Sequence, residues 1–346
     1  MGISASSLSG AGSVSCPGNG GVVNMAVEQV LQARVIKKRR GLNRLQRRTL
    51  SFYMFVSPWL IGFILLGVFP LVLGILTSLT NYDGLNFFNI KFVALNNYAR
   101  AFQDRDVPFS LGRTVIWGVI NLPLWMILSF VLAVILNQDV RGRDFFRVAF
   151  YLPSIIPAVA AINAWRIILE KNFGMLNALI SVFQPGTAVG WLSDYALQGM
   201  TLIAVWGGLG GGMIIFLAGL QNIPDELVEA AKIDGANGLQ IFRHIVLPLM
   251  TPVIFLQLVQ GLIGVFQQLN LPLILSTVGL TTGVPPRPIY LYMIHVYRQI
   301  FVNGRYGYGT ALLWMLFIGV VILTALVFWS SKYWVYSDSP VQGGAE

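Results

Sequence analysis

The stretch YGYGTALLWMLFIGVVILTALVFWSS, residues 306–331, contains no Asp, Glu, Lys or Arg over its 26 positions. A helix of about 20 apolar residues spans the ~30 Å hydrocarbon core of a bilayer, because each residue advances the helix by about 1.5 Å. This stretch is therefore predicted to be a transmembrane helix. The same absence of charge recurs in five further runs, 49–82, 114–138, 148–165, 195–224 and 245–286.

Two of these runs have unusual lengths. The run 148–165 is shorter than a full crossing until its partly apolar flanks, 145–146 and 167–169, are added. The run 245–286 is long enough for two crossings, but its second half contains TVGLTTGVPPRP, and such a Gly/Pro-rich composition is typical of a loop. We therefore predict six transmembrane helices and an all-α integral membrane protein.

The composition of the 346-residue chain agrees with this prediction. Charged residues make up 11% of the chain and hydrophobic residues 55%, whereas soluble domains contain about 25% charged residues. Too few polar side chains remain to cover a water-facing surface. The composition excludes an ordinary soluble enzyme, a disordered chain and a nucleic-acid partner, although the formal net charge is +9.

The positions of Lys and Arg predict the orientation. Residues 34–48 contain eight basic side chains and no acidic one, immediately before the first run. The positive-inside rule places this segment in the cytoplasm, although an anchor for anionic lipid would fit the same topology. An even number of spans then returns the C-terminus to the cytoplasm. We expect a largely disordered cytoplasmic tail at 1–48, the first transmembrane helix at 49–82, an external loop at 83–112, a five-helix core at 113–335 and a cytoplasmic tail at 336–346.

Several kinds of chemistry have no residues to support them. His244 and His295 have no metal-ligand spacing, and the six runs contain no carboxylate for a proton relay or an ion site. A Walker A loop requires Gly-Lys, and this dipeptide does not occur in the chain. The protein is therefore expected either to move a solute passively or to receive energy from another subunit.

The loop 221–248, QNIPDELVEAAKIDGANGLQIFRHIVLP, is the most informative segment. Pro224 suits the first position of a helix, and Gly235 suits the left-handed residue that ends one. The helix between them is too short to be stable alone, so it is expected to pack against another surface. We expect a turn at Asn237-Gly238, a helical pattern over 239–247 and a bend into the fifth span at Pro248.

The chemistry of this short helix favours docking onto another protein. Its small side chains Ala230 and Ala231 permit close approach, and acidic residues surround them. The alternative is a helix that lies on the membrane surface, but such helices usually carry basic residues on their polar face. The acidic residues concerned are Asp225, Glu226, Glu229 and Asp234.

The same loop carries a long, gapped motif. Glu229-Ala230-Ala231 is followed after three residues by Gly235, and after nine more by Ile245, one residue and Leu247-Pro248. This spacing matches the EAA motif of ABC importer permeases, so the chain resembles that family over about residues 50–335. Segments similar to its carbohydrate-uptake branch, which includes the maltose and glycerol-phosphate permeases, are SPWLIGFILLGVFPL (57–71), LNNYARAF (95–102), NQDVRGRDFFRVAFYLPSIIPAVAA (137–161) and FLAGLQNIPDELVEAAKIDGA (216–236).

The resemblance implies a type I, MetI-like importer permease fold and a set of partners. These are a second homologous permease, two ATPase subunits, an extracytoplasmic solute-binding protein and the lipid bilayer. The chain itself would not be an enzyme and would hold no cofactor, since ATP and Mg²⁺ would be bound by the partner ATPase. The implied location is the bacterial inner membrane. The implied coupling residues are Glu229, Ala230, Ala231 and Gly235, with Asp234 as a flanking charge.

Polar and aromatic residues within the spans are candidates for a solute path. Gln257, Gln260, Gly264 and Gln267 recur at helical spacing, so they are expected on one face. Amides within a membrane are costly unless they line water or bond to a neighbouring helix, and both readings stay open. Asn270, beside Gln267 and Gln268, and Trp206, before the glycine-rich segment 207–212, complete the candidates; we expect the glycines to serve close helix packing.

The resemblance implies import of a sugar or an oligosaccharide. The same machinery importing glycerol phosphate or another small polar solute is the alternative. A membrane-embedded enzyme or scaffold is an alternative of another class, and it would need a catalytic constellation that the sequence does not contain. The external loop 276–308 contains Arg287, Arg298 and Arg305, which could meet the binding protein or an anionic solute, or simply face solvent.

Overall fold

The computed structural model describes residues 44–336, except 86, 87, 89, 140, 279, 280 and 283. The predicted N-terminal tail, most of its basic segment and the C-terminal tail lie outside the described residues. The chain divides into two compact units, up to Pro70 and from Leu71 onward. Each unit is described by itself.

The first unit is a long apolar helix. It comprises α2 (Arg44–Phe63) and a π-helical turn (Ile64–Val68), and α3 (Phe69–Ser78) continues the helix into the second unit. Residues Arg48–Ser78 are long and apolar enough to cross a membrane. Its large apolar side chains, such as Phe55 and Leu66, are exposed within the chain. The predicted first span, 49–82, overlaps this segment but extends four residues beyond its end at Ser78.

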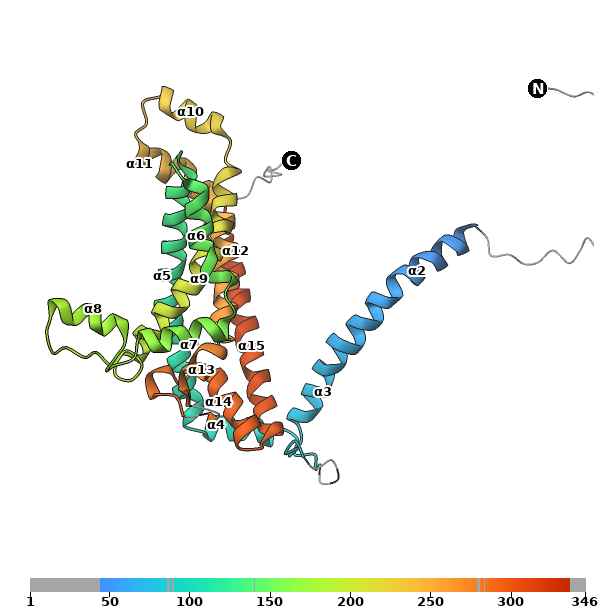
Figure 1. Ribbon diagram of the computed structural model, residues 1–346. Helices are drawn as coiled ribbons and strands as arrows, with labels where there is room; N and C mark the ends of the chain where they lie inside the picture. The colour runs from blue at the N-terminus through green and yellow to red at the C-terminus, as the bar shows by residue number, and fades with distance from the viewer. Residues whose placement is uncertain are drawn as a thin grey trace, which may run out of the picture. The chain divides into compact units, whose positions relative to one another are not determined.

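Four long helices form the bundle of the second unit (Figure 1). They are α5 (Asp106–Asn137), α9 (Ala196–Gln221), α12 (Leu247–Phe266) and α15 (Tyr306–Ser331). Trp125 of α5 donates a hydrogen bond from Nε1 to the Gly208 carbonyl of α9 at 2.9 Å, and Ser129 donates to the Leu209 carbonyl at 3.2 Å. Such bonds between helices fix the register of α5 against α9.

The third predicted span is a broken helix. It consists of α6 (Arg143–Ile155) and α7 (Ala158–Ile168), which are bent by 97° relative to each other. Ile156 is extended at φ −66° and ψ 132°, because Pro157 disfavours a helical conformation in the preceding residue and has no N–H to donate. The described residues thus contain five helices able to cross a membrane, and six if this bent pair counts as one span.

The fifth predicted span begins earlier than expected. Residues 238–266 are helical throughout, as α11 (Gly238–Ile241), a π-helical turn (Phe242–Val246) and α12. Pro248 therefore does not bend the chain, because it lies in the first turn of α12, where a missing N–H is tolerated. After α12 the chain forms α13 (Asn270–Ser276) and a short antiparallel pair, β1 (Thr277–Val278) and β2 (Thr281–Thr282), in the predicted loop.

Short helices cover the end of the bundle that lies opposite α10 (Figure 1). They are α4 (Asn96–Gln103), within the predicted loop 83–112, a 3₁₀ turn (Arg287–Ile289), α14 (Tyr292–Tyr297) and a π-helical turn (Arg298–Val302). Ala101 of α4 and Val296 of α14 are buried in one apolar cluster with Leu312 of α15. This cluster ties the end cap to the bundle. The short helix α8 (Met175–Phe183) lies between α7 and α9 in sequence.

Candidate functional site

The predicted short helix of the loop 221–248 is present as α10 (Asp225–Ile233), at one end of the bundle (Figure 1). Pro224 is the N-cap residue, one position earlier than expected, and Asp225 and Glu226 lie in the first turn. There their carboxylates interact favourably with the positive end of the helix dipole. None of the residues of α10 is buried. The helix therefore offers nearly its whole surface to another molecule.

Backbone hydrogen bonds end α10 in a Schellman motif. The Ala236 N–H donates to the Ala231 carbonyl at 2.9 Å, and the Gly235 N–H donates to the Lys232 carbonyl at 3.1 Å. Gly235 has φ of +82°, the left-handed conformation that this motif requires. The prediction for Gly235 is confirmed.

The following residues differ from the predicted turn. Asn237 is the N-cap of α11, and its Oδ1 accepts from the Gln240 N–H at 2.9 Å. Gln240 Oε1 accepts in return from the Asn237 N–H at 2.8 Å, which completes a capping box. Gly238 is the first residue of α11 rather than part of a turn. Backbone and capping hydrogen bonds thus hold the chain on both sides of Gly235.

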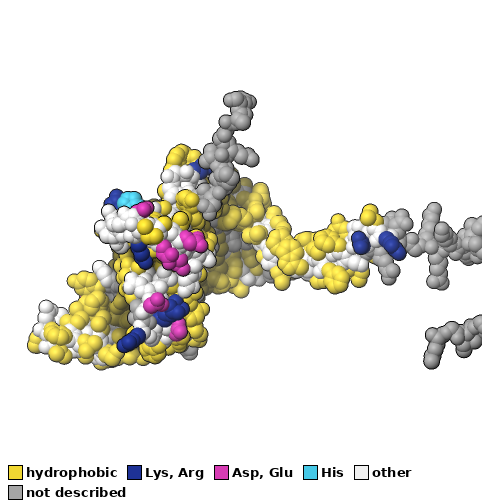
Figure 2. Space-filling view, turned by 90° about the horizontal axis from the view of Figure 1, so that it is seen from above, with side chains coloured by type: hydrophobic (Ala, Val, Ile, Leu, Met, Phe, Trp, Pro, Cys, Tyr) yellow, Lys and Arg dark blue, Asp and Glu magenta, His cyan; other side chains and the backbone are white. Residues whose placement is uncertain are grey.

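The predicted coupling residues lie on the surface of this loop. Glu229, Ala230, Asp234 and Gly235 are exposed, and Ala231 is half-buried. Large apolar side chains accompany them, since Leu227 is 46% and Ile233 is 86% exposed. Acidic side chains gather on this end of the molecule, between basic ones (Figure 2). Among the described residues none of the acids of α10 forms an ion pair, whereas Arg143 pairs with Asp139 at 3.0 Å.

A polar and aromatic pocket lies where α6 breaks into α7. Its volume is about 260 Å³, and Trp206, Gln268 and Asn270 line it together with Ser154 and Ile156 at the break. Trp206 packs edge-on against Trp165 of α7, with ring centroids 5.5 Å apart. Two of the predicted candidates, Trp206 and Asn270, therefore meet in one place together with Gln268, whereas Gln257, Gln260 and Gln267 do not line this pocket. The break between α6 and α7, which makes room for them, was missed, although the Pro157 signal was present.

The predicted amide face of the fifth span is divided. Gln257 is buried, and its Nε2 donates to the Gly212 carbonyl of α9 at 3.4 Å. Gln260, Gly264 and Gln267 are exposed. Of the two alternatives, a hydrogen bond between helices applies to Gln257. The other three residues are exposed and, within the described part of the chain, make no such contact with a neighbouring helix.

The glycine-rich segment of α9 packs on two sides and is open on a third. A Cβ on Gly208 would lie 3.0 Å from Trp125 Nε1, and one on Gly212 would lie 2.7 Å from Ser129 Oγ. A Cβ on Gly210 would overlap the backbone of α6 at Phe150. Gly207 and Gly211 have no neighbouring atom within 4 Å of such a Cβ. Close packing accounts for three of these glycines, and Gly207 lines the pocket beside Trp206.

The fold and these sites define a class of protein. Apolar helices long enough to span a membrane carry an open pocket with polar and aromatic side chains among its lining, and an exposed acidic helix projects from one end of the bundle. These are features of a multi-pass membrane transport component.

Comparison with known proteins identifies the family. Residues 125–334 match the family described as "Binding-protein-dependent transport system inner membrane component". The chain is 35% identical over 311 residues to the probable ABC transporter permease protein YesP of Bacillus subtilis, which covers 89% of this chain and 97% of that protein. The chain belongs to this family of transport permeases.

Other relatives are named as permeases of sugar transport systems. The multiple sugar-binding transport system permease MsmF of Streptococcus mutans is 28% identical and covers 76% of this chain and 89% of its own length. The arabinooligosaccharides transport system permease AraP of Bacillus subtilis is 28% identical and covers 80% and 84%. The fold is similar to a chain of a bacterial ABC transporter involved in the import of the acidic polysaccharide alginate, with a TM-score of 0.71, 20% identity and coverage of 83% and 96%.

Proposed function

We propose that this chain is the permease subunit of an ATP-driven, binding-protein-dependent importer of sugars or oligosaccharides. It lies in the inner membrane with both termini in the cytoplasm, and it contributes no catalysis of its own. Its family membership and the sugar-related names of MsmF and AraP support this reading. The observation that carries it is the separation of two sites, with α10 projecting from one end of the bundle and an open pocket at Trp206 where α6 breaks into α7.

The loop at α10 is the proposed coupling element, in which Glu229, Ala230, Ala231, Asp234 and Gly235 dock onto a partner ATPase. That subunit, present in two copies, binds ATP and Mg²⁺. Because α10 ends in a Schellman motif and α11 begins with a capping box, the loop transmits displacement as a stiff unit. A displacement of the loop therefore reaches α12 without a flexible joint, because the helix is continuous from Gly238 to Phe266.

The solute path is proposed to pass the pocket at the break between α6 and α7. Trp206 offers a flat aromatic face, and Gln268 and Asn270 offer hydrogen-bonding groups without net charge. Gln260 and Gln267 extend the polar surface along the exposed face of α12. A second homologous permease covers this face in the assembled importer. Gln257 is assigned to helix packing instead.

The experiment is reconstitution of the importer in lipid vesicles. The chain is co-expressed with its neighbouring permease, ATPase and binding protein, and uptake of labelled oligosaccharides is measured with ATP inside the vesicles. Neutral oligosaccharides, acidic oligosaccharides and glycerol phosphate form the panel. ATP-dependent uptake of a saccharide supports the proposal. Uptake of glycerol phosphate alone favours the alternative solute, and binding-protein-independent turnover of any compound favours an embedded enzyme.

A further inference from the structure

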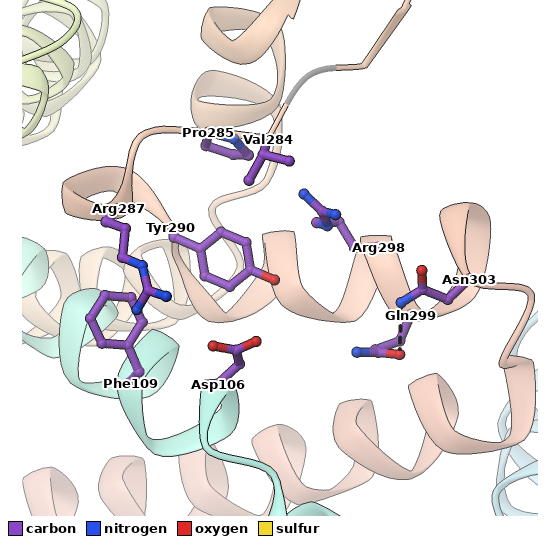
Figure 3. A pocket seen from close by; sticks show the side chains of 9 residues that line it. All are labelled: Asp106, Phe109, Val284, Pro285, Arg287, Tyr290, Arg298, Gln299 and Asn303. Atoms are coloured by element: carbon purple, nitrogen blue, oxygen red, sulfur yellow. Dashed lines mark hydrogen bonds between the residues drawn. The ribbon is translucent and has the colours of Figure 1, made fainter.

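A second polar cavity lies in the end cap opposite α10. Its volume is about 210 Å³, and its polar lining consists of Asp106, Arg287, Tyr290, Arg298, Gln299 and Asn303. These side chains come from the start of α5 and from the segment between β2 and α15, and they point toward a common space (Figure 3). The coupling loop and the pocket at Trp206 use none of them.

Two arginines in this cavity have no acidic partner. The Arg287 guanidinium lies over the Phe109 ring, 5.0 Å from its centroid, and Arg298 is half-buried. In the described part of the chain neither forms an ion pair within 4.0 Å. A guanidinium stays charged at any physiological pH and presents a planar fork that matches a carboxylate. Two such groups in one cavity favour an anionic ligand.

The remaining polar groups suit hydroxyls rather than a bare anion. The Asp106 carboxylate faces the cavity (Figure 3) and would repel an isolated anion, but it accepts hydrogen bonds from hydroxyl groups. Asn303 donates from Nδ2 to Gln299 Oε1 at 3.1 Å, which holds both amides in place. The cavity therefore combines positive charge with groups that recognise neighbouring hydroxyls.

Tyr290 forms a fixed wall of the cavity. Its hydroxyl lies 3.0 Å from His295 Nδ1, and His295 Nε2 lies 3.4 Å from Asp104 Oδ2. Tyr308 donates to the same carboxylate oxygen at 2.8 Å. His295 Nε2 makes no hydrogen bond to the described residues, but the Asp104 carboxylate at 3.4 Å would repel a lone pair there, so we assign the neutral His295 proton to Nε2 and Tyr290 donates to Nδ1. The Tyr290 oxygen is then left to accept a hydrogen bond within the cavity.

We propose that this cavity binds a uronic-acid unit, a sugar whose carboxylate engages Arg287 and Arg298 and whose hydroxyls engage Asp106 and the amide pair. One sugar ring carries both functions side by side, whereas an acidic protein side chain carries only the carboxylate. The inference rests on the proposed function, since it names the class of saccharide that reaches this end of the importer. It adds acidic saccharides to the range of solutes that the importer recognises.

The test measures binding to the assembled importer in lipid nanodiscs. Glucuronate, glucose and acetate are titrated separately by calorimetry or ligand-observed NMR. We expect glucuronate to bind and both comparison ligands to bind at least tenfold more weakly. Arg298→Gln should weaken glucuronate binding by about ten- to hundredfold, because it removes a charge-assisted bond. Arg287→Gln changes an exposed side chain, so it repeats the test without endangering the fold.

Arg305→Gln is the matched control, because this arginine is exposed and belongs to the same segment but does not line the cavity. It should change glucuronate binding by less than twofold. The inference is overturned if glucuronate does not bind, or if glucose or acetate binds as tightly as glucuronate. It is also overturned if Arg305→Gln weakens glucuronate binding as much as Arg298→Gln does. If the wild type does not bind glucuronate, and sugar-free binding protein docks more weakly to Arg287→Gln than to the wild type, the cavity is instead a contact site for the binding protein.

The failure of this inference is distinguishable from failure of the proposed function. The same nanodiscs are assayed for ATP hydrolysis stimulated by binding protein loaded with a neutral oligosaccharide. Stimulation without glucuronate binding leaves the proposed function standing and removes only the uronic-acid site. If no saccharide of either kind stimulates hydrolysis, the proposed function itself fails.

Discussion

The contact between α9 and α6 at Gly210 yields a quantitative prediction. A Cβ at this position would overlap the Phe150 carbonyl oxygen and lie 2.6 Å from Tyr151 Cα. Both atoms belong to the backbone of α6, so no side-chain rotation relieves the overlap. The neighbouring Gly211 has no atom within 4 Å of a Cβ. Gly210→Ala and Gly211→Ala are therefore matched changes in one helix that differ in the space available.

The expected magnitudes follow from two opposing effects. Replacing a helical Gly by Ala stabilises a helix by about 1 kcal/mol, and this gain applies at both positions. At Gly210 the backbone of α6 must also move by about 1 Å to restore an ordinary contact, and such overpacking costs typically ~1–3 kcal/mol or more. We expect Gly211→Ala to be neutral or stabilising and Gly210→Ala to be destabilising, with a difference of about 2 kcal/mol between them.

The assay is thermal unfolding of the purified importer in nanodiscs. Unfolding is measured as the loss of the monodisperse fraction in size-exclusion chromatography after heating. Gly210→Ala should lower the midpoint by a few degrees relative to Gly211→Ala, since ~1 kcal/mol shifts a domain of about 150–250 residues by about 2–4 °C and a larger one by less. Wild type and Gly211→Ala serve as references for expression and insertion. Equal midpoints, or a lower midpoint for Gly211→Ala, would refute the close approach of α6 to α9.

Three further predictions concern the coupling loop, the end cap and the solute pocket. Gly235→Asp and Glu229→Lys should abolish ATP-driven uptake, because both change the proposed surface for the ATPase. Both variants should still insert in the membrane, since Glu229 is exposed and Asp tolerates the left-handed conformation of residue 235. Persistent solute-stimulated ATP hydrolysis in both variants would contradict the coupling role. Burial lowers the pKa of His295, although the neighbouring Asp104 carboxylate opposes this shift. The unfolded chain therefore binds a proton at this histidine more readily than the folded chain does. The free energy of unfolding is unaffected by His295 above about pH 6.5 and decreases as the pH falls below that value. His295→Gln should flatten the unfolding midpoint between pH 7 and 5, and an unchanged pH slope would exclude this histidine as its source. Asn270→Ala removes an exposed pocket amide, so it should raise the KM for oligosaccharide uptake several-fold at unchanged stability, and an unchanged KM would remove Asn270 from the path.

Asp104 shows why part of the end cap was beyond sequence reasoning. Burial raises its pKa, but the Asp106 N–H, the Tyr308 hydroxyl and His295 together hold it below its ordinary value. The Asp106 N–H is adjacent in sequence, but the side-chain partners His295 and Tyr308 are distant, and Tyr308 belongs to α15. No spacing rule links residues so far apart. The sequence shows that Asp104 is charged, but only the folded chain shows which side chains it contacts.

Local signals predicted much of the rest. The absence of charge placed five long helices, and the dihedral angle of Gly235 followed from its position after a short helix. Pro157 is also a local signal, since it disfavours a helical residue before it. Only the absence of charge was considered in this segment of the sequence, so the break in the helix was not predicted. The pocket at Trp206 exists because that break turns α7 through 97° across α9 and α13.

The sequence by itself determined which segments are long and apolar enough to span a membrane, and it placed some helix ends, such as that of α10 at Gly235, because charge and glycine act through the bilayer and the local backbone. Only the tertiary structure decided which face of each helix meets another. Gln257 and Gln260 share one helix and one side-chain type, yet one bonds to the Gly212 carbonyl and the other is exposed. That difference depends on how close α9 comes to α12, a distance that side chains far apart in the sequence set together.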